Sequence, residues 1–317
     1  NKKISNNTKI IEVQGDIIVP DIKPDIVSII NTNAIPYIFK EEVFSGRIRI
    51  EGNIDAYIIY LADNGENRSI GTTLAFIDNI EDSLIKEGAK VKQSIELENI
   101  EAKVLNERKL MIKAILKVKS DIYEREEISL NNDFNDIKDV QKLTENLNIK
   151  SIVGLNTVRT SMKEDVTVDD DYNISEILNL SVNIVNFENK ISINKVLAKA
   201  EAEIRVIFLA EDGRISIAKA NIPIMSFIDI DKVSDKNICN VDYVIRNMLF
   251  KVSTTNKHTI NCQIEFDVSC EAYEIKNIEV VQDMYGINTN MDYTKREVLV
   301  QTNDNDISEE ININETT

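Results

Sequence analysis

The single histidine and two of the three cysteines are the residues that could begin a catalytic or zinc-binding site. His258 lies between Lys257 and Thr259 near an expected strand start, and we interpret its side chain as solvated. Nucleophilic catalysis would need a base that a third group orients, and the sequence indicates no such group. Cys262 and Cys270 are separated by seven residues and no Cys-x-x-Cys occurs, so we expect no zinc site. We predict that the chain is not an enzyme and takes no cofactor.

Three consecutive aspartates, Asp169-Asp170-Asp171, are the strongest cation-binding candidate. An EF-hand loop that started at Asp169 would have Ile174 at its sixth position, where glycine is required. It would have Leu180 at its twelfth position, where a bidentate glutamate belongs. The run therefore fails as an EF-hand. We interpret it as a solvated turn or cap, with a looser surface calcium site as the alternative, and we predict no metal ligands.

The cysteine count separates two further interpretations. Three cysteines are too few for a disulfide framework, and the odd number leaves at least one unpaired within the chain. Cys239, Cys262 and Cys270 are best interpreted as small buried side chains. The alternative is that they cross-link subunits of an assembly.

The charge balance excludes several classes of partner. The chain has 54 Asp and Glu against 37 Lys and Arg, a formal net charge of -17. Such a surface repels phosphate backbones and anionic lipids, so we expect neither nucleic-acid nor membrane binding. No apolar run approaches the roughly 20 residues that span a bilayer, and no secretory signal opens the sequence. We therefore expect a protein that is made in a cytosol.

The sequence contains one module twice. The segment Tyr60-Leu61-Ala62-Asp63-Asn64-Gly65 recurs 148 residues later as Phe208-Leu209-Ala210-Glu211-Asp212-Gly213. The same offset pairs further residues along about 100 positions: Ile26 with Ile174, Ile29 with Ile177, Phe39 with Phe187, Ile58 with Val206, Ile112 with Ile260, and Leu116 with Ile264. An offset of 149 pairs the earlier residues Thr8 with Thr157, Asp16 with Asp165, and Val19 with Val168.

Each copy has the hydrophobic period of β-strands. Apolar residues alternate with polar ones over 48–60 and 196–208, which is typical of strands with one face on a core. The Asp63-Asn64-Gly65 and Glu211-Asp212-Gly213 segments predict hairpin turns. Further strands are expected at Leu110–Val118, Thr259–Val268, Val91–Leu97 and Arg296–Gln301.

The resulting fold class is all-β: two tandem β-sandwich-like or open-barrel domains with short helices in the connections. The helices are expected at Asp25–Ile30 and Ile174–Leu178, each after an Asp-bearing turn that could cap it. A turn or two of helix is also expected within Asn135–Asn146. The predicted limits are 1–127 for the first domain, 128–149 for a connector, 150–285 for the second domain, and 286–317 for a C-terminal strand and acidic tail.

The turn before the first repeat carries a family resemblance. The segment Gly15-Asp16-Ile17-Ile18-Val19-Pro20-Asp21-Ile22-Lys23-Pro24-Asp25-Ile26 resembles the opening of the SPOCS domain of clostridial spore-coat proteins. The strand that ends in Tyr60-Leu61-Ala62 is similar to the same domain. A later stretch of that domain is similar to Ile222-Pro223-Ile224 with Phe227-Ile228-Asp229-Ile230. The second copy departs from the pattern, because Asp169-Asp170-Asp171-Tyr172-Asn173 replaces the proline-bearing turn.

The resemblance implies a role in the spore envelope. Family members of the SipL type are coat morphogenetic proteins that act through protein contacts, and no family catalytic residues exist to transfer. They typically carry a C-terminal glycan-binding LysM module, which this sequence lacks, so glycan binding is not carried over. The implied location is the mother-cell cytoplasm during sporulation and then the spore surface.

These observations favour a non-catalytic structural building block of the coat, exosporium or a spore appendage. We expect it to form a homo-oligomer or polymer and to contact other spore-coat proteins through unpaired sheet edges and terminal strands. The residues expected to make the assembly contacts are Ile4, Ile10, Ile11, Val13, Val298, Leu299 and Val300. The alternative is a monomeric adaptor that docks another coat protein.

Overall fold

The computed structural model describes residues 2–124, 140–169, 171–287, 294–301 and 308–315, and all regular structure in these residues is β-strand. Within the described ranges, no helix is long and apolar enough to cross a membrane.

The first copy of the module comprises β1 (Lys2–Ile18), β2 (Ile26–Phe44), β3 (Arg47–Ala62), β4 (Asn67–Glu81), β5 (Lys90–Asn106) and β6 (Lys109–Glu124). The second copy comprises β7 (Val140–Thr167), β8 (Ile174–Ser192), β9 (Lys195–Ala210), β10 (Ile215–Asp229), β11 (Ile238–Val252) and β12 (Thr259–Gly286). Two short strands follow, β13 (Thr294–Gln301) and β14 (Ser308–Glu315).

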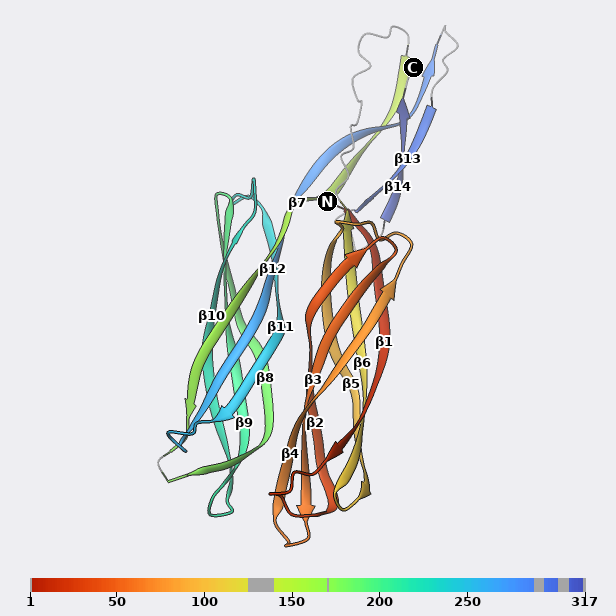
Figure 1. Ribbon diagram of the computed structural model, residues 1–317. Helices are drawn as coiled ribbons and strands as arrows, with labels where there is room; N and C mark the ends of the chain where they lie inside the picture. The colour runs from red at the N-terminus through yellow and green to blue at the C-terminus, as the bar shows by residue number, and fades with distance from the viewer. Residues whose placement is uncertain (1, 125–139, 170, 288–293, 302–307, 316–317) are drawn as a thin grey trace.

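Each copy is built from two antiparallel three-stranded sheets (Figure 1). In the first copy the strand orders are β1-β6-β5 and β2-β3-β4; in the second copy they are β7-β12-β11 and β8-β9-β10. The central strands β3, β6, β9 and β12 are therefore paired on both sides, and the other eight strands of the two copies are sheet edges. The all-β class and the duplication predicted from the sequence are confirmed.

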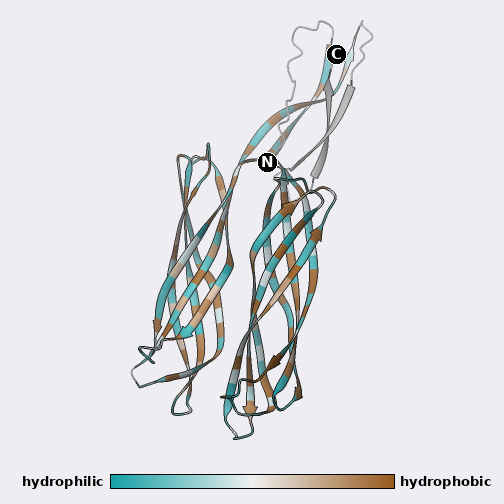
Figure 2. Cartoon of the chain, in the orientation of Figure 1, coloured by the Kyte–Doolittle hydropathy of each residue, from teal (hydrophilic) through white to brown (hydrophobic). Residues whose placement is uncertain are grey.

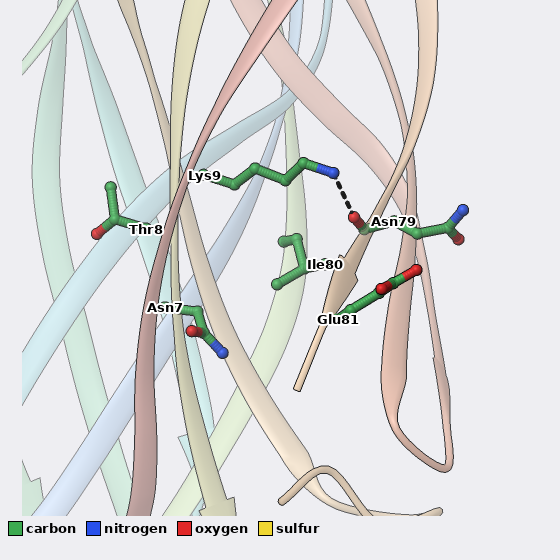
Figure 3. Close-up of a pocket in the computed structure, with 6 residues that line it drawn as sticks. All are labelled: Asn7, Thr8, Lys9, Asn79, Ile80 and Glu81. Atoms are coloured by element: carbon green, nitrogen blue, oxygen red, sulfur yellow. Dashed lines mark hydrogen bonds between the residues drawn. The ribbon is translucent and has the colours of Figure 1, made fainter. Parts of the chain in front are cut away.

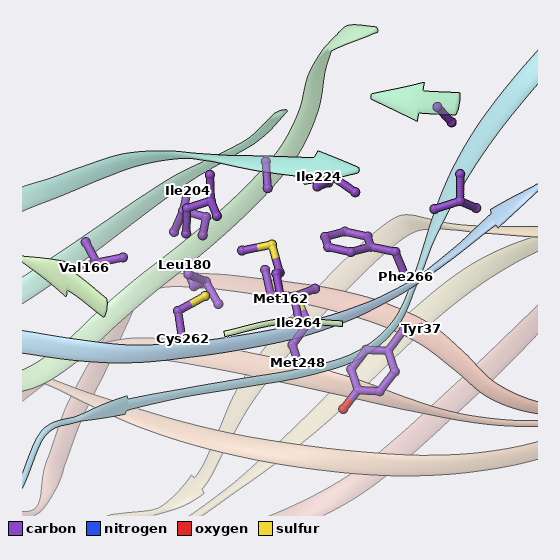
Figure 4. Packing of buried hydrophobic residues seen from close by; sticks show 14 of the residues in the cluster. Tyr37, Met162, Val166, Leu180, Ile204, Ile224, Met248, Cys262, Ile264 and Phe266 are labelled. Carbon is purple, nitrogen blue, oxygen red and sulfur yellow. The ribbon is translucent and has the colours of Figure 1, made fainter. Parts of the chain in front are cut away.

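The hydrophobic alternation places one core inside each copy. Hydrophilic and hydrophobic residues alternate along the strands (Figure 2), as a half-buried strand requires. In β3 the alternate residues Ile48, Ile50, Ile54 and Ile58 are fully buried. Figure 4 shows the equivalent core of the second copy, where Ile204 of β9, Ile264 and Phe266 of β12 and Ile224 of β10 pack together.

Both predicted hairpin turns are confirmed. Gly65 and Gly213 adopt positive φ angles of 81° and 84°, a conformation that glycine accepts without steric cost. The backbone hydrogen bonds repeat as well, because Gly65 N donates to the carbonyl of Ala62 and Gly213 N donates to that of Ala210. The two copies thus share their turns as well as their strands.

The predicted helices at Asp25–Ile30 and Ile174–Leu178 are wrong, because both segments open long strands. Their apolar spacing of three and four residues comes from β-bulges and not from a helical turn. In β2 the register shifts at Val27 and again at Ile30, and in β8 it shifts at the equivalent Ser175 and Leu178. The part of Asn135–Asn146 that the structure describes, 140–146, belongs to β7 and is also not helical. Residues 135–139 lie outside the described residues.

The strand β12 also corrects the repeat alignment of the last strand. In the first copy Leu97 pairs with Leu116, and in the second copy the equivalent Ile245 pairs with Phe266. The offset between β6 and β12 is therefore 150 residues and not 148. The sequence pairs Ile112 with Ile260 and Leu116 with Ile264 were displaced by two residues along the strand.

A long ribbon distinguishes the second copy from the first. Strands β7 and β12 are 28 residues each, and their pairing continues to Val140 and Gly286. This extension projects beyond the sandwich, and the β13–β14 hairpin lies beside it (Figure 1). Residues 140–149, predicted as a connector, and 308–315, predicted as part of a tail, are thus strands.

Candidate assembly surfaces

The single histidine has a structural partner. His258 is half-buried, and its Nδ1 lies 2.8 Å from the carbonyl oxygen of Tyr172, to which it can only donate. The equivalent position in the first copy is Arg108, whose guanidinium donates to the carbonyls of Lys23, Val19 and Pro20. The hydrogen bond of His258 therefore stabilises the turn before β8, and the hydrogen bonds of Arg108 stabilise the proline-bearing turn before β2. The expectation of a solvated histidine is corrected by this contact.

One of the three cysteines is half-buried and the other two are buried. Cys262 and Cys270 are buried in β12, and Cys239 of β11 is half-buried. Cys239 pairs in register with Ala272, so Cys270 is its diagonal neighbour. A hydrogen bond between these two thiols lowers the pKa of Cys239 and raises that of Cys270. Of the three candidate cross-linking residues, Cys239 alone is within reach of solvent.

The acidic turn is held by its own backbone and by an arginine. Tyr172 N donates to the carbonyl of Asp169, and Arg214 Nη2 donates to the carbonyl of Asp171. Asp170 lies outside the described residues. Across the part of the chain that the structure describes, no three His, Cys, Asp or Glu side chains gather as a metal site would require.

A shallow pocket marks a seam between the two sheets of the first copy. It lies where β1 faces β4, and Figure 3 shows its lining residues: Asn7, Thr8, Lys9, Asn79, Ile80 and Glu81. Lys9 bridges the seam, because its Nζ donates to the carbonyl of Asn79 at 2.6 Å and to Asp78 at 2.7 Å. The pocket is therefore part of the packing between the two sheets, which the Lys9–Asp78 ion pair stabilises.

The N-terminal assembly candidates belong to an edge strand. Strand β1 pairs with β6 along its length, from Lys2 opposite Glu124 to Ile18 opposite Lys109. Ile11 and Val13 are buried in the core of their own copy. Ile4 packs at the margin of this core, and Ile10 is exposed on the outer face.

The C-terminal assembly candidates lie in β13. Val298, Leu299 and Val300 pair in antiparallel register with Ile311, Glu310 and Glu309 of β14. The hairpin lies beside the projecting ribbon, and in that ribbon Val280, Val281 and Met284 of β12 are buried.

The two copies pack side by side, and a buried ion network crosses the contact. Arg246 of β11 is 7% exposed; its Nε donates to Asp267 Oδ2 at 2.6 Å, and Arg159 donates to Oδ1 of the same carboxylate at 2.8 Å. From this position Arg246 Nη1 donates to the carbonyl of Ile38 in the first copy, and Glu41 lies 3.5 Å from Nη2. Burial is the largest influence on the pKa of Asp267 and acts to raise it, but the two arginines outweigh it and hold this pKa below its usual value.

A second set of contacts joins β8 to β2 and β4. Ser69 Oγ donates to the carbonyl of Ile177, and Asn33 Nδ2 donates to Asn179 Oδ1 at 2.7 Å. Between these two bonded residues lies the bulge residue Leu178, whose side chain is fully buried. Lys23, from the proline-bearing turn, pairs with Glu176 in the same region.

Aromatic packing completes this contact between the copies. Tyr37 of β2 is 3% exposed and belongs to the hydrophobic cluster of the second copy, where Figure 4 shows it beside Met248. Ile35 and Tyr57 of the first copy pack against the same cluster. Hydrogen bonds, ion pairs and apolar contact together join the two copies.

The sequence analysis did not predict this contact, although one difference between the two copies, an arginine in place of a glutamate, could have indicated it. The bulges occur at equivalent positions in both copies: Val27 and Ser175, Ile30 and Leu178, Phe39 and the Asn186-Phe187 pair, Glu98 and Arg246. At the last of these, an arginine replaces a glutamate at an otherwise duplicated position. Such a charge reversal between copies indicates that the two have different neighbours.

The family model described as SipL, SPOCS domain, matches residues 25–105 and 173–253, about half of the chain. The two matches begin 148 residues apart, the offset that relates β2 to β8. Each match covers the second to fifth strands of a copy. No curated protein and no solved structure matches the chain.

Proposed function

Because the chain belongs to the SipL SPOCS-domain family and is therefore a spore-coat-associated protein, we propose that it is a non-catalytic building block of the spore surface that assembles through its strand edges. Proteins of this spore-coat family are generally non-catalytic. The described histidine and the buried ion network have structural partners, which supports a scaffolding role. The proposal rests mainly on the duplicated module and its projecting ribbon.

The sheet edges supply the backbone groups for assembly. A three-stranded sheet has two edge strands, each with a row of N–H and C=O groups that can pair with another chain. Two edge strands are less able to pair with another chain, because Pro36 lies in β2 and Pro223 lies in β10. Proline cannot donate a ladder hydrogen bond. Strands β1, β7 and β13 contain no proline.

The ribbon and the β13–β14 hairpin form the second element of the proposal. A two-stranded hairpin is only marginally stable alone, because it buries little apolar surface. This one contains Val298, Leu299 and Val300 in sequence, and among the residues that the structure describes its two strands pair only with each other. We infer that a neighbouring subunit pairs with or covers this hairpin and that the outer face of β1, where Ile10 is exposed, contributes a second contact.

The contact between the two copies fixes the orientation of the strand edges and of the projecting ribbon. A strand edge directs assembly only if its orientation is fixed relative to the rest of the subunit. The Arg246–Ile38 bond and the Lys23–Glu176 pair hold the two copies in one orientation. The ribbon grows directly from β7 and β12 of the second copy, so it shares that orientation.

The proposal is tested in sporulating cells of the source bacterium and with purified protein. Immunogold labelling of a tagged chain should place it on the spore surface, and negative-stain microscopy of the pure chain should show polymers. A Val298→Asp, Val300→Asp double variant should lose the polymers, and a Thr302→Asp, Asn303→Asp variant is the matched control. A chain that coats spores but stays monodisperse in purified form and binds one coat protein would instead be an adaptor.

A further inference from the structure

The contact between the two copies joins two different surfaces of one module. The second copy contributes β8 and β11, through Leu178 and Arg246. The first copy contributes the outer face of β2–β4, through Ser69 and the Ile38 carbonyl. A contact between unlike surfaces is heterologous, and such contacts propagate when every unit carries both surfaces.

Because the module is duplicated, each copy carries both surfaces. Within one chain the first copy uses its β2–β4 face and the second copy uses its β8/β11 surface. At the equivalent positions of the first copy, Lys92 of β5 already pairs with Asp242 of the second copy, but Val27 and Ile30 of β2 are exposed. On the second copy, Ile215 and Ile217 of β10 are exposed. Figure 1 shows β10 on the side of the second copy that faces away from the first.

The exposed residues on these two surfaces are apolar at corresponding positions. Ser69 of the first copy donates to β8, and the equivalent residue in β10 is Ile217, which is 56% exposed. Leu178, fully buried in the contact within the chain, corresponds to Ile30 of β2, which is 53% exposed. The pair that would meet between chains is therefore Ile30 with Ile217, and the flanking Val27 and Ile215 are also exposed.

The charges at the equivalent positions are compatible with this contact. Arg246 corresponds to Glu98, and its partner Glu41 corresponds to Asn189. Glutamate and asparagine can hydrogen-bond and do not repel each other. The centre of the β9–β10 face is more polar than its counterpart, because Arg205, paired with Glu203 at 2.6 Å, replaces Tyr57.

We propose that a second copy of this chain docks head to tail, with Ile30 and Val27 of its β2 on Ile217 and Ile215 of β10. The contact repeats between chains the relationship that joins the two copies within a chain. It rests on the proposed function, to which it adds the identity of the partner and the contact surface. It uses side-chain faces and is separate from the strand pairing of the terminal hairpin.

The test uses two complementary variants of the full chain, Ile217→Lys and Ile30→Asp. Each puts a charge into an apolar contact, so each alone should shift the assembly threshold at least tenfold in concentration, as measured by sedimentation velocity. An equimolar mixture should recover assembly, because Lys at 217 in one chain can then meet Asp at 30 in the other. Ile193→Lys and Leu84→Asp, at exposed residues in the connections between strands and outside both surfaces, are the controls.

Each result decides the inference. If both single variants form the same polymers as the wild type, the head-to-tail contact is wrong and the proposed function stands. Single variants that fail and do not recover on mixing would overturn the head-to-tail geometry. A wild type that stays at 36.0 kDa at every concentration would overturn both proposals.

Discussion

The guanidinium of Arg246 donates from Nη1 to the carbonyl oxygen of Ile38 over 2.8 Å, so a bulge in β11 meets a bulge in β2. At each bulge the regular ladder is interrupted, which frees a side chain or a carbonyl to point outward. The same arginine binds Asp267 within its own copy. One side chain thus couples the fold of the second copy to its position against the first.

Arg246→Met should destabilise the protein by roughly 3 kcal/mol, because removing one partner leaves a buried carboxylate incompletely paired. Urea unfolding measures the loss. Arg159→Met is the control: Arg159 binds the same Asp267 but is 52% exposed, so we expect a loss of about 1 kcal/mol or less. Equal unfolding midpoints for Arg246→Met and the wild type would contradict the account.

Glu41 should give the unfolding free energy a recognisable pH dependence. Burial raises the pKa of Glu41 above 4.5, and Arg246 opposes this only in part. Between the unfolded and folded pKa values the native state binds the extra proton, so this group's contribution to stability falls as pH rises through that window. Urea titrations from pH 4 to 7 should therefore show Glu41→Gln gaining stability relative to the wild type as pH rises. Glu42→Gln, at the neighbouring residue that pairs with Lys40, should not show this trend.

Gly52→Ala should destabilise the first copy by about 1–3 kcal/mol through overpacking. A Cβ at this position would lie 2.6 Å from the carbonyl oxygen of Tyr37 and 2.3 Å from the ring of Phe76. Gly71→Ala is the matched control, since its nearest neighbour would be 3.9 Å away. Thermal unfolding compares the two; a Gly52→Ala melting temperature equal to that of Gly71→Ala would show that the ring and backbone shift freely.

His258→Arg should preserve stability, whereas His258→Ala should lose about 1 kcal/mol with its hydrogen bond. The reason is the equivalence with Arg108, which fastens the corresponding turn of the first copy. Melting temperatures of both variants test this. If alanine and arginine gave the same temperature, the bond to Tyr172 would carry no stability.

Cys239 should be alkylated by iodoacetamide before the other two cysteines. The thiolate is the reactive form; the bond from Cys270 lowers the pKa of Cys239, whereas burial raises that of Cys262 to about 12. Peptide mass spectrometry should find Cys262 and Cys270 modified only in urea. Early modification of Cys262 would mean that β12 opens in the native protein, and Cys239→Ser should remove the fast phase.

The sequence predicted strands and turns well because their signals are local. Alternation over 48–60 and the Gly65 and Gly213 turns depend only on neighbouring residues, and duplication doubled each signal. The helix predictions failed where two bulges fall within four residues of each other, as at Val27 and Ile30, because bulges change a period of two into spacings of three and four. The displaced pair Ile112–Ile260 escaped notice because a shift of two residues keeps every side chain on the same face.

The contact between the copies could not be predicted from the same signals. The sequence pattern indicates a surface charge at Arg246. Its contact with Ile38 becomes evident only in the three-dimensional structure. Likewise, the period-two pattern marks Ile217 and Met225 as the solvent-facing side of β10, without indicating why that side is apolar. Long-range contacts of this kind depend on the relative position of whole domains, which periodicity does not encode.

Sedimentation velocity of the 317-residue chain across a wide concentration range tests the central claim most directly. A self-assembling building block should appear as a series of species at multiples of 36.0 kDa that grows with concentration. A single species of 36.0 kDa at every concentration would contradict the account.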